Sequence, residues 1–189
     1  MSLAIPVHLV DYDPRWPALA AHYASRFGAL GELVGDIEHI GSTSIPGLIA
    51  KPVIDLMPIV DDLERLDAHR AEVEAIGLGW HGEFGVDGRR FCTLEGESGE
   101  RLLNVHFYQR GSPHILRHLA FRDYLRRHPD VAAAYATEKR RVAALYPDDS
   151  TRYAAEKGPF IRATVEAAIA AHEADSAALT AKVGVDDVD

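Results

Sequence analysis

The first apolar pattern along the chain has helical spacing. Asp13 and Pro14 mark a helix start, because Asp caps a first turn well and Pro suits the first helical position. Apolar residues then recur every three or four positions to about Leu33, namely Trp16, Leu19, Ala20, Tyr23, Phe27 and Leu30. This pattern predicts an N-terminal helix with one buried face.

Shorter apolar runs predict a mixed sheet. We expect five strands, at residues 37–40, 53–60, 78–84, 89–94 and 101–109. The connection between the first two strands is shorter than a parallel crossover usually is, which favours an antiparallel or mixed arrangement. One inserted helix is expected between Asp61 and Gly77.

The last third of the chain has helical patterns. Ser112 and Pro113 begin a helix to about Arg127, and Pro129 separates it from a second helix. The run from Pro147 to Ser150 ends that second helix and caps a last one. The predicted class is therefore α+β, with an N-terminal helix, a mixed sheet of about five strands and a C-terminal helical half.

Length and composition favour one domain. We expect a single domain over residues 1–173, with a sheet core at 5–110 and a helical half at 112–173. Residues 174–189 form an acidic tail that we predict to be disordered. The single cysteine excludes a disulfide framework within the chain and, with no signal peptide or membrane span in the pattern, favours the cytoplasm.

Charge narrows the class of ligand. The formal net charge of −9 argues against binding to duplex nucleic acid, which usually needs a basic face. The negative net charge does not exclude a small anionic ligand that is bound in a local basic pocket. We expect no membrane partner, and we find no indication of the oligomeric state.

Candidate chemistry begins with Asp55, a single charge on an apolar strand. Alternation places Asp55 on one face with Val53 and Met57, while Ile54 and Leu56 point to the other face. A buried carboxylate needs a hydrogen-bond partner or a cation. Two interpretations stay open, a cation ligand and a structural Asp that accepts backbone N–H groups from the preceding loop.

The strand at 101–109 carries polar residues in its middle. Asn104, His106 and Tyr108 share one face, and Leu103, Val105 and Phe107 share the other, which we assign to the core. We expect this strand to be central. The polar stripe indicates either a cleft or a solvated outer face.

The stretch before Asp55 is suited to phosphate. Gly41 and Ser42 form a turn that offers backbone N–H groups and a hydroxyl to an anion. We expect a cleft between this turn, the second and last strands, and the helical half.

These motifs resemble those of the GrpB-like proteins, in the nucleotidyltransferase-fold superfamily. The resemblance rests on the run from His39 to Asp55 and extends over most of residues 5–170 through Val10–Trp16, Asn104–His106, Phe121–Leu125, Tyr135–Lys139 and Tyr153–Lys157. It implies a nucleotidyltransferase-like fold. Some relatives are fused to dephospho-CoA kinase, which points to a nucleotide or coenzyme A connection.

The superfamily pattern also implies a catalytic arrangement. A Gly-Ser turn precedes a strand with two acidic residues, a later strand adds a third, and two divalent cations lie between them and the nucleotide. Gly41, Ser42 and Asp55 match this pattern. Met57 stands at the second acidic position, and Asn104 or His106 stands at the third. One carboxylate of three is present, which argues against standard two-metal catalysis.

Two kinds of site stay open. In the first, Asp55 and His106, with His39, hold one divalent cation such as Mg²⁺, Mn²⁺ or Zn²⁺. In the second, no metal binds and an anion is cradled by turn residues and neutralised by basic side chains, namely Gly41, Ser42, Thr43, Lys51, Arg90, Lys139 and Lys157. Only one of Arg89 and Arg90 can face the cleft.

The two helical lysines have a second interpretation. Each follows a tyrosine by four residues, Lys139 after Tyr135 and Lys157 after Tyr153, so each pair shares a helix face. The repeat indicates either a phosphate pocket or lysines extended along the core edge. His114 and His118 are also one helical turn apart, and we interpret them as surface residues.

Two functions follow from these sites. In the first, the protein transfers a nucleotidyl or phosphoryl group to or from a nucleotide-type or other phosphorylated small molecule. Asp55 then holds the cation, and His106 is a second ligand or a base. In the second, the protein is a non-catalytic module that binds a nucleotide, another anion or a partner.

Overall fold

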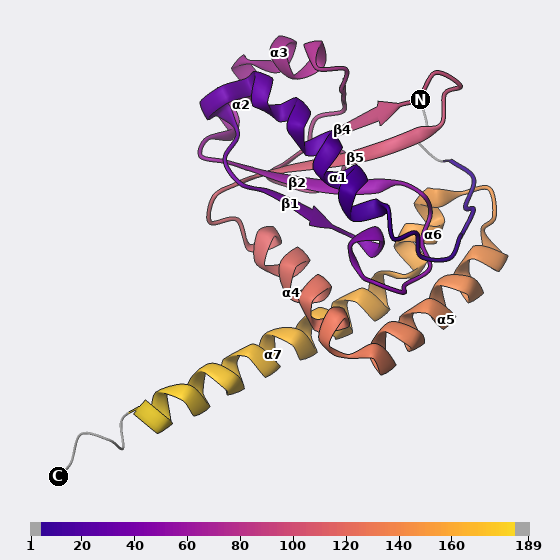
Figure 1. Cartoon of the computed structure of the whole chain (residues 1–189), viewed down its shortest axis with the longest axis vertical. Helices are drawn as coiled ribbons and strands as arrows, with labels where there is room; N and C mark the ends of the chain where they lie inside the picture. Colours follow the sequence, from indigo (N-terminus) through magenta and orange to yellow (C-terminus); the bar gives the residue numbers. More distant parts are fainter. Residues whose placement is uncertain (1–4, 184–189) are drawn as a thin grey trace.

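The sheet has five strands and mixed pairing. Strands β1, β2, β4 and β5 are labelled in Figure 1. The computed structural model describes residues 5–183, and the side chains of residues 5–171. Along the sheet the order is β1-β2-β5-β4-β3, and the strands are β1 (Ile37–Ile40), β2 (Ile54–Val60), β5 (Arg101–Gln109), β4 (Arg89–Glu95) and β3 (Gly79–Trp80). Strand β1 is antiparallel to β2, and β2 is parallel to β5. The α+β class, the mixed sheet and the central place of β5 are confirmed.

One face of the sheet packs against the N-terminal half of the chain. Alternation on β2 and β5 turns Ile54, Leu56, Leu103, Val105 and Phe107 into the main core. Helix α1 (Trp16–Ala24) covers this core with Trp16, Ala20 and Tyr23. Helices α2 (Leu63–Ala68) and α3 (Arg70–Ala75) each add a fully buried residue.

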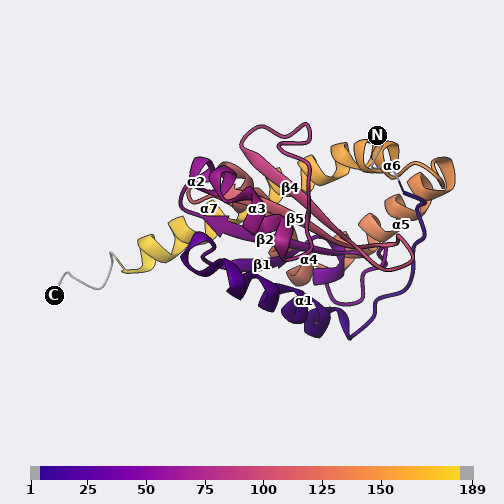
Figure 2. The same cartoon turned by 90° about the horizontal axis from the view of Figure 1, so that it is seen from above.

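The other face of the sheet is covered by the helical half. Its helices are α4 (Pro113–Arg127), α5 (Pro129–Leu145), α6 (Ser150–Glu156) and α7 (Gly158–Val183). Met57 and Tyr108 lie on this face, where Ile115 and Leu119 of α4 pack against them. Helix α7 extends away from the rest of the molecule toward the C-terminus (Figure 2). Helix α1 lies on the side of the sheet that faces away from α6 and α7.

Several element boundaries differ from those that the sequence predicted. The N-terminal helix changes to a 3₁₀ segment at Ser25–Leu33, where Gly31 leaves helical geometry. The inserted helix is two short helices separated at His69. The strand predicted at 78–84 is reduced to the two residues of β3. Helix α7 continues through residues 174–183, the first part of the tail predicted to be disordered, and the rest of that tail lies outside the described residues.

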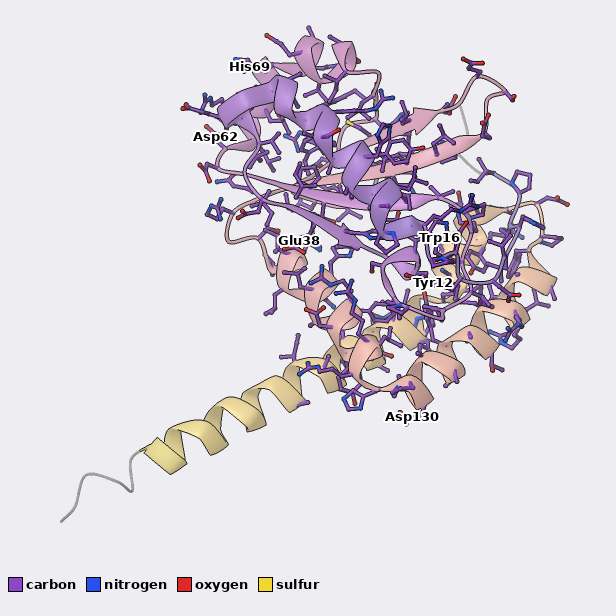
Figure 3. All side chains as sticks on the ribbon, viewed as in Figure 1. Tyr12, Trp16, Glu38, Asp62, His69 and Asp130 are labelled. Carbon is purple, nitrogen blue, oxygen red and sulfur yellow. The ribbon has the colours of Figure 1, made fainter. Side chains whose placement is uncertain are left out.

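The chain before α1 is tied to the domain. Val10 pairs with Ala50 in an isolated antiparallel bridge. Tyr12 packs edge-to-face on Trp16, with ring centroids 5.3 Å apart, and the two side chains lie together in Figure 3. The Val10–Ala50 bridge holds the loop between β1 and β2, which forms one wall of the site. In the part of the chain that the structure describes, the helices are all too short or too polar to cross a membrane.

Candidate functional site

A cavity of about 200 Å³ lies above the ends of β2 and β5. Eight polar residues of its wall come from five parts of the chain: Ser42, Thr43, Lys51, Asp55, Asn104, Lys139, Tyr153 and Lys157. The cavity lies where the sequence predicted a cleft, between the Gly-Ser turn, two strands and the helical half. The polar face of β5 therefore lines a cleft, and the alternative of a fully solvated outer face is excluded at Asn104.

Asp55 enters the cavity wall because β2 and β5 pair in parallel. This pairing places Asp55 beside Asn104, whose Nδ2 donates to Asp55 Oδ1 at 2.9 Å. His106 Nε2 lies 3.5 Å from the same oxygen. Burial raises the pKa of Asp55, but hydrogen bonds from His106 and Asn104 and the charge of Lys51 outweigh it, and the net pKa is below its usual value. Asp55 is thus held as a carboxylate.

His106 lies between Asp55 and a buried arginine. Arg89 Nη1 is 3.4 Å from His106 Nδ1, on the opposite side of the ring from Asp55. An arginine can only donate, so Nδ1 accepts and the ring proton of neutral His106 resides on Nε2, directed at Asp55. This arrangement suits a residue that positions Asp55 better than it suits a general base.

Gly41 lets the turn approach Asp55 closely. Its φ of +70° and ψ of −171° belong to a region that is essentially restricted to glycine. A Cβ at this position would lie 3.0 Å from the Asp55 Cβ and Cγ and closer still to Oδ2. Among the described residues, the hydrogen bonds of the Asp55 carboxylate come from side chains and not from backbone N–H groups of the turn. The interpretation of Asp55 as a carboxylate held by the loop backbone is therefore corrected.

Three lysines converge on the cavity. Lys51 lies in the loop between β1 and β2, Lys139 comes from α5, and Lys157 lies at the break between α6 and α7. Lys139 is only 1% exposed and its ammonium donates to the Ile49 carbonyl. Both helical lysines were predicted for this pocket, and the structure brings them together with Lys51.

The lysines are crowded enough to lower one another's pKa. Burial, then the charge of Lys157, lowers the pKa of Lys139 to about 6. Burial, then the charge of Lys51, lowers the pKa of Lys157 to about 8. Burial also lowers the pKa of Lys51, although Asp55 opposes this shift. The single carboxylate of Asp55 cannot balance the positive charge of three protonated lysines, so the cavity lacks negative charge.

Tyr153 is a wall residue that sequence reasoning did not assign to the site. It is 1% exposed, and the Lys157 ammonium lies 4.0 Å from its ring centroid, a cation–π distance. Its buried hydroxyl has no hydrogen-bond partner within the described residues. The four-residue spacing to Lys157 was the available signal, but the sequence analysis used it to assign only Lys157, and not Tyr153, to the pocket.

His39 is not brought to the metal site that the sequence predicted. The register pairs His39 with Leu56, and opposed residues share a face, so His39 lies on the opposite face from Asp55. Its Nε2 is 2.9 Å from Thr43 Oγ1, and burial lowers its pKa to about 4. Among the residues that the structure describes, no three His, Cys, Asp or Glu side chains form a group that could hold a metal ion.

Arg90 also lies outside the cavity. The prediction that Arg90, and not Arg89, is the arginine that faces the cleft is therefore wrong. Arg90 forms an ion pair with Asp67 of α2 at 2.6 Å, on the face of the main core. Arg89 occupies the Asp55 face because neighbouring residues of β4 alternate. His118, interpreted as a surface residue, is instead packed near His106 with ring centroids 5.8 Å apart, and burial lowers its pKa to about 3.

Comparison with known proteins identifies the family. A family model described as GrpB protein matches residues 6–167. The chain belongs to the GrpB family. A crystal structure of the conserved protein GrpB from Enterococcus faecalis is 39% identical, with a TM-score of 0.79, over 87% of this chain and 99% of that one. The resemblance to GrpB-like proteins stated from the sequence motifs is confirmed.

Two curated relatives are longer than this GrpB chain. The protein YqkA of Bacillus subtilis is 37% identical over 161 residues, which cover 85% of this chain and 46% of YqkA. A protein named dephospho-CoA kinase from Mycolicibacterium paratuberculosis is 30% identical over 83% of this chain and 44% of its own length. This chain thus spans less than half the length of both relatives.

Proposed function

We propose that the cavity binds the phosphate groups of a nucleotide-type or other phosphorylated small molecule. The observation that carries this proposal is the convergence of Lys51, Lys139 and Lys157 on a cavity with one carboxylate. A bound phosphate would supply negative charge and so favour the protonated form of these lysines, whose pKa values burial and mutual repulsion lower. The unpartnered Tyr153 hydroxyl adds a donor to the same wall.

Group transfer at this cavity is the second candidate function, favoured by the pairing of Asp55 with His106. Superfamily chemistry uses two cations held by several carboxylates. The donor set here does not fit such a centre, because Met57 is fully buried at the second acidic position and Asn104 occupies the neighbouring strand. A single cation that binds to Asp55 and His106 stays a prediction, as does nucleotidyl or phosphoryl transfer.

Removing Lys157 is expected to weaken phosphate binding. Titrating the protein with inorganic pyrophosphate by calorimetry should show binding, and Lys157→Met should weaken it by roughly tenfold or more, since a charge-assisted contact is lost. Arg140→Met is the matched control, because Arg140 is exposed beside Lys139 and carries the same charge. Equal losses in both variants, or no binding by the wild type, would contradict the proposal.

Anion binding is also expected to depend on pH. A bound anion stabilises the protonated lysines, so it raises their lowered pKa values and binding takes up protons. Lys157, with a pKa of about 8, gains its proton between pH 9 and pH 7, and affinity for sulfate should rise roughly tenfold over that interval. Sulfate is chosen because its own charge is constant there.

The Lys157→Met variant separates this effect from a general change in surface charge. Calorimetry in two buffers of different ionisation enthalpy measures the proton uptake directly. Sulfate affinity that does not vary from pH 9 to pH 7 in the wild type, or that varies equally in Lys157→Met, rules out Lys157 as the group responsible.

A further inference from the structure

A second hollow adjoins the lysine cavity. Its volume is about 280 Å³, and it shares Lys51, Asn104 and Ala154 with the lysine cavity, so the two are direct neighbours. The second hollow has an aromatic wall made by Phe84 and Phe91. Each hollow alone is small for a ligand, whereas small-molecule sites usually span about 300–1,000 Å³. The two together are large enough for a ligand with two parts.

A row of side chains across the sheet connects the two hollows. Asp55 on β2 lies beside Asn104 on β5, and the next inward residue of β5, His106, is opposite Phe91 on β4. All of these side chains share one face by alternation. The row changes from polar to aromatic as it passes from the lysine cavity to the second hollow.

Phe84 is held in an unusual conformation at the mouth of the second hollow. It is 48% exposed, and it is the one non-glycine residue with positive φ, +46°, in the part of the chain that the structure describes. A bulky residue in this region is strained, and such strain is commonly maintained at functional positions. The Phe84 ring stacks on Phe91, with centroids 5.3 Å apart and planes within 18°.

Two buried arginines support this wall. Arg89 Nη2 donates to the Phe84 carbonyl at 2.8 Å, and its Nε donates to the Glu83 carbonyl at 3.2 Å, which fixes the loop that carries Phe84. The Arg101 side chain lines the hollow, is 6% exposed, and its buried Nε has no partner within the described residues. The hollow therefore combines an exposed aromatic face with a wall that buried arginine contacts hold in place.

We propose that Phe84 and Phe91 form a stacking subsite for a planar, nitrogen-containing aromatic ring whose attached phosphate occupies the lysine cavity. This inference rests on the proposed function and narrows the ligand to the nucleotide class. The outer face of Phe84 provides the stacking surface. Stacking tolerates any base, since every base has a π-face.

The test compares ligands with and without a ring. The wild-type chain, Phe84→Ala and Phe84→Tyr are each titrated with ADP, GDP, CDP, UDP and inorganic pyrophosphate. At least one nucleoside diphosphate should bind the wild type about tenfold more tightly than pyrophosphate. Phe84→Ala should remove this gain and leave pyrophosphate affinity unchanged, while Phe84→Tyr should retain it.

The matched control is Leu145→Ala, which truncates another large apolar residue that is 57% exposed on α5. Thermal melting verifies that each variant is folded. Equal affinity for pyrophosphate and all four diphosphates, or equal losses in Phe84→Ala and Leu145→Ala, overturns the stacking subsite and leaves the phosphate site standing. Failure of the wild type to bind pyrophosphate or any diphosphate overturns both.

Discussion

Replacing Gly41 with alanine is expected to lower the free energy of unfolding by about 3 kcal/mol. Two costs combine. The backbone at φ +70° and ψ −171° is strained for any residue with a Cβ, and the new Cβ would overlap the Asp55 side chain, which is held by Asn104. Urea denaturation of both proteins measures the difference, and a lower midpoint with an unchanged m-value is expected.

Gly47→Ala is the matched control for the Gly41 variant. Gly47 also has positive φ, +78°, but its Cβ would meet nothing within 4 Å, so only backbone strain of about 1 kcal/mol is expected. Equal losses in the two variants would show that the turn does not press on Asp55. The Gly41 variant should also bind pyrophosphate more weakly, because Asp55 and the turn must separate.

If the protein catalyses group transfer, replacing Asp55 with asparagine is expected to lower the rate of that transfer by at least about 100-fold. Asparagine preserves the shape and can still accept from Asn104 Nδ2, but it lacks the charge that would hold a cation at the phosphates. The assay measures transfer or hydrolysis across nucleoside triphosphates with Mg²⁺, Mn²⁺ or Zn²⁺ in turn. Unchanged turnover in Asp55→Asn would remove Asp55 from the catalytic role.

The same variant separates the two candidate functions. Asp55→Asn retains all three lysines, so pyrophosphate binding should persist in it whatever happens to turnover. If the wild type binds pyrophosphate but shows no turnover with any nucleotide and metal, the protein is a binding module. Lys139→Met in the same assay keeps Asp55 and His106, and it tests whether the lysines hold the phosphate that would be transferred.

Alternation along strands was the most reliable guide to the site. It placed Asp55 opposite Ile54 and Leu56, and it placed Asn104 and His106 opposite the core residues of β5, as the structure confirms. The same rule failed for His39. Alternation within β1 says only that His39 and Ile40 point apart, and the register with β2 decides which of them shares a face with Asp55.

The helical lysines show a different limit. Their spacing from Tyr135 and Tyr153 predicted shared helix faces, but a face acquires a role only from what packs against it. The break at Lys157 and the packing of α5 and α6 bring both ammonium groups to Lys51. Phe84 had no signal at all, because its strained backbone and its stacking on Phe91 arise from the loop and from the Arg89 contacts.

The sequence by itself determined the class of fold, the two faces of the central strands, the Gly-Ser turn before Asp55 and membership in the GrpB family. These properties follow from local periodicity and from motifs of neighbouring residues. Only the tertiary structure decided that Asp55 meets Asn104 and His106, that three lysines share one cavity, and that Arg90 pairs with Asp67 outside it. Strand register and helix packing are set by the whole core, and no local pattern encodes them.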